Sequence, residues 1–283
     1  MINLLKKAFD FFVFSSLFIA VCAVLMVLQT YLLFQVPVSV TLILFVFCGS
    51  VCSYNFHWFL TPPHVQNPSR KTLWNINYKY VHLALATAGL IGAAITAFLL
   101  IQHWFWLGVT AFLTFLYTAP KIPHPLFTWL RKIALAKTIF LAFAWTHITV
   151  LLPLLVGGDE INWAAIVFTV NRFFFLYAIC IVFDRRDVED DKKAGIQSLI
   201  TFLDEKGIGI IFWGSVIVAV ITNIILLNWF SGMTCFLLFV PVFVLILLYQ
   251  PSKKNSSDYL YYFTLDGLMA LSASLLILIK FVR

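Results

Sequence analysis

The chain has 283 residues, of which 62% are hydrophobic and only 11% are charged. With a mean hydropathy of +0.98, this composition excludes a soluble globular protein, in which about a quarter of the residues are charged. A helix that crosses a hydrocarbon core of about 30 Å needs about 20 apolar residues, and runs of this kind recur along the chain. The sequence therefore predicts an all-α membrane protein with many spans.

The apolar windows predict nine transmembrane helices separated by short polar breaks. They fall at about 9–33, 38–60, 79–101, 103–118, 134–156, 162–183, 207–229, 232–249 and 259–281. Lys6 and Lys7 before the first run resemble the start of a secretory signal. The run from Phe11 to Phe34 is longer than the apolar region of a signal, so we expect a retained span rather than a cleaved peptide.

Basic residues gather on one side of these spans. The N-terminus and the loops after the second, fourth, sixth and eighth spans hold 16 of the 19 Lys and Arg residues. The positive-inside rule then places the N-terminus and these loops in the cytoplasm, and we expect a multi-pass protein of a bacterial inner membrane. The net charge of +7 is thus a topology signal and requires no nucleic-acid partner.

Five of the 12 acidic residues lie within eight positions at the end of the sixth span, in "FDRRDVEDDKKAG". If that helix continues, Asp184, Asp187 and Asp191 share one face at i, i+3 and i+7. Three stacked carboxylates repel one another unless a cation lies among them, and Mg²⁺ prefers such oxygen ligands together with substrate phosphates. The alternative is a solvated connector of mixed charge, as most charge runs are.

The motif "DRRDVEDDKKAGIQSL" resembles the second aspartate-rich motif of the UbiA superfamily of intramembrane aromatic prenyltransferases. "LYTAPKIPHPLFTWLRK" is similar to the family's Tyr-Ser/Thr-x-Pro stretch with its following basic residues. The resemblance implies a nine-helix UbiA-type bundle around a central cavity, formed by residues 1–283 as a single domain. It also implies Mg²⁺-dependent transfer of a prenyl group from an isoprenyl diphosphate to a lipophilic, often aromatic, acceptor.

The first aspartate-rich motif of the family, NxxxDxxxD, is degenerate in this chain. The matching stretch reads "CSYNFHWFLTPPH", in which Asn55 is present but Phe59 and Pro63 stand where the aspartates belong. No acidic residue lies between Asp10 and Asp159, so a shifted register cannot supply the missing ligands. Half of the metal site implied by the resemblance is therefore absent.

The resemblance assigns roles to specific side chains. Asp184, Asp187 and Asp191 would hold Mg²⁺ and diphosphate, Asn55 would assist, and Tyr117 matches the family tyrosine. The candidates for binding diphosphate are Lys121, Arg131, Lys132, Arg70, Lys71 and Lys193. Asp266, about two turns into the ninth span, is a further candidate metal ligand that could replace a carboxylate of the missing motif.

Other polar residues in or beside the spans leave alternatives open. Arg172, 12 residues before Asp184, would either bind an acidic acceptor or pair with another helix. His57 is a candidate ligand, although an interfacial histidine beside Trp58 is the commoner arrangement. The five cysteines all lie in apolar runs without the spacing of a metal site, so we expect small buried side chains.

Two functions of different classes follow from these residues. The first is a prenyltransferase that works with the second motif alone. The second is a non-catalytic protein of the same fold that binds a prenyl lipid or a protein partner after loss of the first motif. A transporter is a third class, supported only by the span count and Arg172.

Overall fold

The computed structural model describes residues 2–61, 69–122, 137–158, 160–193 and 199–282. Within these ranges the protein is almost entirely helical, and eight helical segments are long and apolar enough to cross a membrane. A ninth helix, α6, occupies the place of the predicted fourth span but has 15 residues, or about 22 Å of helix. The prediction of an all-α membrane bundle is confirmed, and the number nine holds only approximately.

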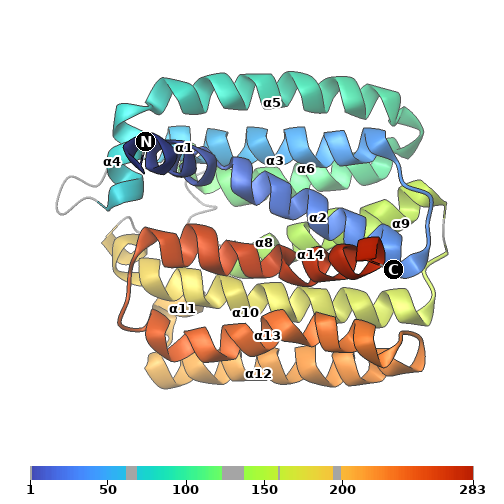
Figure 1. Cartoon of the computed structure of the whole chain (residues 1–283). Coiled ribbons are helices and arrows are strands. Elements are labelled where there is room, and N and C mark those ends of the chain that lie inside the picture. Colours follow the sequence, from blue (N-terminus) through green and yellow to red (C-terminus); the bar gives the residue numbers. More distant parts are fainter. Residues whose placement is uncertain (1, 62–68, 123–136, 159, 194–198, 283) are drawn as a thin grey trace.

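The helices follow the chain in a simple order (Figure 1). Those of the N-terminal half are α1 (Ile2–Phe14), α2 (Leu17–Phe34), α3 (Val40–Leu60), α4 (Arg70–Asn77), α5 (Lys79–Leu99) and α6 (Trp104–Thr118). Those that follow are α8 (Lys137–Thr146), the π-helix η5 (His147–Leu151), α9 (Leu152–Gly157), α10 (Trp163–Lys193), α11 (Leu199–Phe202), α12 (Glu205–Ile225), α13 (Gly232–Ser252), the π-helix η7 (Leu260–Leu265) and α14 (Asp266–Val282). Short 3₁₀ turns, η1 (Ile101–His103), η2 (Ala119–Lys121) and η6 (Leu226–Asn228), adjoin α6 and α12.

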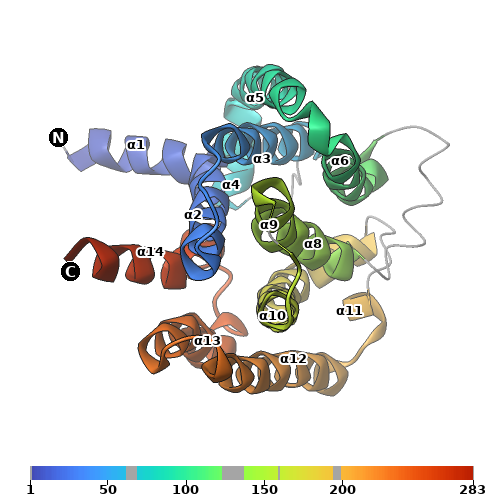
Figure 2. The ribbon, with the colours of Figure 1, turned by 90° about the vertical axis from the view of Figure 1, so that its right-hand side faces the viewer.

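The first predicted span begins too early. The apolar run that starts near residue 9 is divided at Ser15 and Ser16, where Ser16 adopts a left-handed backbone with φ of 64°. The segment before this break, α1, runs across the direction of the bundle helices at the end where α4 lies (Figures 1 and 2). The membrane span is therefore α2, and the hydropathy of the run alone does not reveal the break.

Polar side chains fix the starts of four helices. Ser39, Ser69, Asp204 and Ser231 each accept a hydrogen bond from a backbone N–H in the first turn of α3, α4, α12 and α13. Such caps satisfy donors that no carbonyl of the same helix can reach. They explain why each of these helices begins at the residue directly after its cap.

The packing follows chain order around a ring, seen end-on in Figure 2. Helices α6, α8, α10, α12, α13 and α14 pack in succession. Helix α14 packs against α2, and α2 packs against α3. Gly89 of α5 allows close contact with α3, since a Cβ there would lie 2.7 Å from the Cys48 carbonyl oxygen. The ring is weakest between α3 and α6, which touch at few places.

Candidate active site

The carboxyl ends of α3, α6 and α13 meet α4, η7 and the later part of α10 at one end of the bundle. We call it the basic end because its described cations include Arg70, Lys71, Lys121, Arg185, Arg186, Lys253 and Lys254. The predicted acidic motif lies at this end, on the extension of α10 beyond its apolar part. The sequence predicts a helix that continues through Asp184 and Asp187, and the structure confirms it.

Two carboxylates of this motif have defined partners. Asp184 is 8% exposed and accepts a hydrogen bond from the Thr138 hydroxyl of α8. Asp187 pairs with Arg186, with Nε to Oδ1 at 2.6 Å and Nη2 to Oδ2 at 3.2 Å. Arg186 also donates from Nη2 to the Tyr262 hydroxyl of η7 at 2.9 Å. The motif is therefore connected to α8 and to the start of the last span.

Asp266 is the first residue of α14 and directly follows the π-helix η7. Arg186 and Lys71 are the cations whose charges act on its carboxylate. A π-helical turn changes the direction of the side chains that follow it and is common at functional sites. Asp266 thus belongs to the basic end by position and by charge.

Asn55 holds the break between α1 and α2. Its Nδ2 donates to the carbonyl oxygens of Ser15 at 2.9 Å and Val51 at 2.8 Å, and its Oδ1 lies 2.7 Å from Nδ1 of His82. The side chain is fully buried. These bonds occupy the amide, and its predicted catalytic assistance stays a prediction.

Lys71 is the other residue that holds this break. Its ammonium donates to the Phe14 carbonyl oxygen, at the C-terminus of α1 where a cation is favoured. Four rings surround it, with Nζ 4.5 Å from the centroid of Trp58 and 5.5 to 5.9 Å from those of Trp74, Phe14 and Tyr262. Burial lowers the pKa of Lys71 well below its usual value, and Asp258 and Asp266 partly oppose that shift.

Two aromatic rings connect the cations of the basic end. The Trp58 ring lies near Lys71 and also near Lys121, whose Nζ is 5.6 Å from its centroid and donates to Thr61 Oγ1 at 2.6 Å. The Tyr262 ring lies 5.9 Å from Lys71 Nζ and 4.9 Å from Arg186 Cζ. Lys71 and Arg186 are therefore no more than about 11 Å apart, the sum of those two distances.

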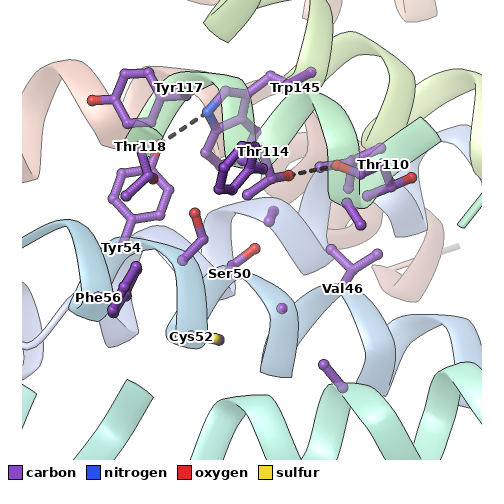
Figure 3. Close-up of a pocket in the computed structure, with 18 of the residues that line it drawn as sticks. Val46, Ser50, Cys52, Tyr54, Phe56, Thr110, Thr114, Tyr117, Thr118 and Trp145 are labelled. Atoms are coloured by element: carbon purple, nitrogen blue, oxygen red, sulfur yellow. Dashed lines mark hydrogen bonds between the residues drawn. The ribbon is translucent and has the colours of Figure 1, made fainter. Parts of the chain in front are cut away.

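A cavity of about 380 Å³ opens between α3, α5, α6 and α8 (Figure 3). Tyr117 and Thr118 of α6 line it near the basic end, where Tyr117 stacks on His57 at 4.7 Å between ring centroids. Tyr54 of α3 reaches across to α8, where it accepts a hydrogen bond from Trp145 Nε1 at 3.0 Å. The cavity lies where the helix ring is weakest and extends from the basic end toward the middle of the bundle.

Comparison with known proteins identifies the family. A model described as the UbiA prenyltransferase family matches residues 75–268, more than two thirds of the chain. The chain belongs to this family. A solved structure described as the apo structure of a UbiA homolog from Aeropyrum pernix K1 is similar over 96% of this chain and 98% of that chain, with a TM-score of 0.62 at 14% identity. A search of curated protein sequences found no match.

The UbiA resemblance seen in the sequence is therefore confirmed for family and fold. The matched range includes the second aspartate-rich motif and ends just beyond Asp266. The residues of the degenerate first motif, Asn55 and Phe59, precede it. The family assignment thus rests on the part of the chain that retains its acidic residues.

The described side chains do not gather a complete metal site. Nowhere in the described ranges do three His, Cys, Asp or Glu side chains approach closely enough to hold an ion. Asp187 is paired with Arg186, and Asp184 accepts from Thr138. The side chain of Asp191 lies outside the described residues, as do those of Arg131, Lys132 and Lys193.

The other predicted residues are placed as follows. Arg70 is bound to Asp10 of α1 at 2.6 Å, so that it and Lys71 both attach α4 to α1. Arg172 is 3% exposed and donates to Gln29 Oε1 of α2 at 2.5 Å, so of the two alternatives left open for it the structure contains the pairing with another helix. The amide of Gln29 in turn donates to Ser272 of α14 at 3.0 Å.

Sequence reasoning missed the side chains that depend on contacts between distant segments. Tyr54 and Trp145 are 91 residues apart and meet only in the fold. Arg186 is one of several basic residues beside the acidic motif, and the sequence does not reveal that it connects Asp187 to Tyr262. The one available signal for Tyr54 was its place beside Asn55 in the degenerate motif.

Proposed function

We propose that this chain transfers a prenyl group from an isoprenyl diphosphate to a lipophilic acceptor, of aromatic type, within the membrane. The observation that carries the proposal is the group of cations Lys71, Lys121 and Arg186 around the rings of Trp58 and Tyr262. A diphosphate is an anion that such a group attracts, and charge-assisted hydrogen bonds from Arg and Lys bind phosphate oxygens. The adjoining apolar cavity suits hydrocarbon.

The proposed reaction has two steps. The bond between the first prenyl carbon and the diphosphate oxygen breaks, and its electron pair leaves with the diphosphate. A carbon of the acceptor then bonds to the allylic cation and loses a proton to the released diphosphate. Cations near the leaving oxygen stabilise its growing charge, and aromatic faces such as Trp58 and Tyr262 stabilise the allylic cation.

Mg²⁺ belongs to the proposal because prenyltransferases of this family use it through aspartate-rich motifs. Asp184, Asp187 and Asp191 are the proposed ligands, with Asp266 as a further candidate. Since the described side chains do not form a complete site, the steps above depend on the protein's own cations. Asn55, Tyr117 and the remaining basic candidates, Arg70, Arg131, Lys132 and Lys193, keep their predicted roles as part of the proposal.

We also propose the orientation that the charges predict. The chain is a multi-pass membrane protein, and its basic end would face the cytoplasm of a bacterium, with residues 1–283 acting as one UbiA-like domain. The supporting observation is that 16 of the 19 basic residues belong to the N-terminus and the loops on that side. Labelling of a cysteine introduced at the exposed Lys254 by an impermeant thiol reagent in intact cells tests this, because a cytoplasmic site stays unlabelled.

A second function is favoured by one specific observation. Asn55 and Lys71, on the side of the degenerate motif, make buried structural contacts with the carbonyls of Ser15 and Phe14. A protein that had kept the fold and lost diphosphate ionisation would make such contacts. In that case the chain would bind a prenyl lipid or a protein partner without catalysis.

Release of diphosphate from labelled C10, C15 and C20 isoprenyl diphosphates by purified protein separates the two functions. The transferase should release it with Mg²⁺ and lose the activity in Asp187→Ala. Glu189→Ala is the matched control, since Glu189 lies in the same helix with its side chain 74% exposed. No release with or without candidate acceptors, and no change in Asp187→Ala, would favour the non-catalytic function.

A further inference from the structure

Helix α1 separates its charged side chains from its apolar ones. At 3.6 residues per turn, Lys6, Lys7 and Asp10 fall within about 100° of one another around the helix. The other side of the helix is apolar and consists of Leu4, Leu5, Ala8, Phe9 and Phe12. Leu4 and Leu5 are 73% and 64% exposed within the protein. An apolar surface of α1 is therefore left uncovered by the described residues.

Contacts at the end of α1 show which way each side points. On the charged side, Asp10 accepts hydrogen bonds from Arg70 of α4 at 2.6 Å and from the Tyr259 hydroxyl. On the opposite side, the Phe12 ring meets the ring of Phe18, in the first turn of α2, at 5.7 Å between centroids. The charged side is thus turned toward α4, and the apolar side toward the membrane span α2.

The chain itself fixes the depth of α1 in the membrane. Only Ser15 and Ser16 separate it from α2, whose 18 residues span about 27 Å, close to the thickness of a hydrocarbon core of about 30 Å. Helix α1 runs across the bundle direction at that end (Figures 1 and 2). It therefore lies along the boundary between hydrocarbon and headgroups, with its apolar side facing the hydrocarbon.

Only the later part of α1 is packed against other helices. Among the described residues, its ring contacts and side-chain hydrogen bonds with other elements all involve Phe9 or later positions. A helix of 13 residues is only marginally stable in water by itself. Burial of Leu4 and Leu5 in a lipid surface would stabilise the earlier part, and helices with this distribution of side chains lie in the membrane interface.

The charges of α1 indicate the kind of lipid. The charge of Asp10 is compensated by Arg70, whereas Lys6 and Lys7 are exposed and form no ion pair with a described carboxylate. Lysine stems can extend from an interfacial helix to the headgroups. A second copy of the chain is a poorer occupant, because a two-fold contact through α1 would bring the lysines of both copies together.

We propose that α1 is an interfacial helix that binds anionic lipid. Its apolar side chains, Leu4, Leu5 and Phe12, enter the acyl chains, and Lys6 and Lys7 bind the phosphates of anionic headgroups. The occupant is the lipid surface of the leaflet that borders the basic end. This binding surface does not depend on prenyl transfer and can be tested without turnover.

Hydrogen exchange of the full chain in lipid nanodiscs, read by mass spectrometry, tests the proposal. The two lipid compositions are phosphatidylcholine alone and phosphatidylcholine mixed with phosphatidylglycerol. A lysine close to an anionic membrane surface strengthens binding about fivefold. The backbone amides of α1 should therefore exchange at least about tenfold more slowly in the anionic discs. The amides of α10 and α12 should exchange alike in both, which shows that the bundle is intact.

Two double variants form a matched pair for the role of the lysines. Lys6→Gln with Lys7→Gln should reduce the effect of anionic lipid on α1 to less than about twofold. Lys206→Gln with Lys254→Gln removes the same charge from two exposed lysines at the basic end and should keep the full effect. Lysine and glutamine have similar helix propensities, so neither pair should change the helix itself.

Leu5→Gln tests the apolar side, again without a large change in helix propensity. It should speed the exchange of α1 amides at least about threefold in both lipid compositions, because less apolar area enters the acyl chains. The ratio between the two compositions should persist, since both lysines remain. The two kinds of variant thus separate apolar insertion from charge attraction.

Three results would overturn the proposal. One is equal exchange of α1 in neutral and anionic discs, and another is the same lipid effect in the two double variants. The third is exchange of α1 that slows only in discs holding two copies of the chain, which would assign its apolar side to a second copy.

Discussion

The two sides of the basic end share one fold but contain opposite chemistry. On the side of α10 and α14, Asp184 and Asp187 belong to the second aspartate-rich motif, Asp187 pairs with Arg186, and Asp266 of α14 lies within range of the Arg186 charge. On the side of α3 and α4, where the first motif belongs, Asn55 and Lys71 bind the backbone at the break between α1 and α2. The first side keeps the acidic residues of the family motif, whereas on the second side Asn55 and Lys71, although they belong to the proposed site, also form a structural joint between α1 and α2.

The largest expected effect tests the acidic side. Asp184→Asn should lower diphosphate release about 100-fold or more, because it removes a buried negative charge from the proposed catalytic group. Steady-state measurement of released diphosphate checks this. Glu205→Gln makes the same chemical change at an exposed carboxylate that pairs with Arg185 and Lys253, and it should keep full activity. Equal activity of the two variants would remove Asp184 from the site.

The next effect tests the joint. Asn55→Ala should lower the free energy of unfolding by about 3 kcal/mol, because it leaves buried groups of Ser15 and His82 without partners. Equilibrium unfolding in mixed micelles measures the change. Asn228→Ala, at an exposed amide that donates to the Ile225 carbonyl oxygen, should have an effect of less than about 0.5 kcal/mol. A similar loss in both variants would contradict a joint at Asn55.

The contrast also shows how far the sequence could predict this molecule. The continuous apolar runs and the charges of the loops are enough to predict a bundle of membrane helices. The motif that contains Asp184 and Asp187 is enough to predict the family. The sequence predicts that Asn55 assists the metal because Asn55 occupies the first position of the family's NxxxDxxxD pattern. Its contacts with Ser15 and His82, 40 and 27 residues away, exist only after folding.

The same limit applies to the break at Ser16 and to the cavity. Two serines inside an apolar run do not predict the left-handed backbone of Ser16. The backbone at this break is held by side chains of α3 and α4. The hydrogen bond between Tyr54 and Trp145 likewise forms only when α3 and α8 pack against each other. Local composition therefore predicts where helices begin and end. The roles of the polar residues depend on hydrogen bonds between distant segments, which the sequence does not show.

A smaller effect follows from the buried cation of the joint. Burial lowers the pKa of Lys71 well below its usual value of about 10.4, so the unfolded chain binds more protons than the folded one between these two values. The free energy of unfolding should therefore rise with pH across that window, by at most about 1.4 kcal/mol per pH unit, and level off above the unfolded pKa.

Lys71→Met should remove this contribution. Unfolding free energies of both proteins, measured in steps up to pH 10.5, give the difference that belongs to Lys71. Lys254→Met, at an exposed lysine, should follow the curve of the unmodified protein. A difference between unmodified protein and Lys71→Met that does not change with pH would show that Lys71 is not held as a desolvated cation.

The smallest effect concerns the attachment of α1. Asp10 accepts hydrogen bonds from Arg70 at 2.6 Å and from the Tyr259 hydroxyl, so it connects α1 to α4 and to the start of the last span. The Arg70 side chain is 43% exposed, and water and salt screen such pairs. Asp10→Asn should therefore lower the free energy of unfolding by about 1 kcal/mol at low salt, and by less as salt is added. Glu189→Gln, which affects an exposed pair with Lys192, should show no measurable change. If Asp10→Asn behaves like Glu189→Gln at every salt concentration, α1 is held by Lys71 and Asn55 alone, and the joint is smaller than the contacts of Asp10 indicate.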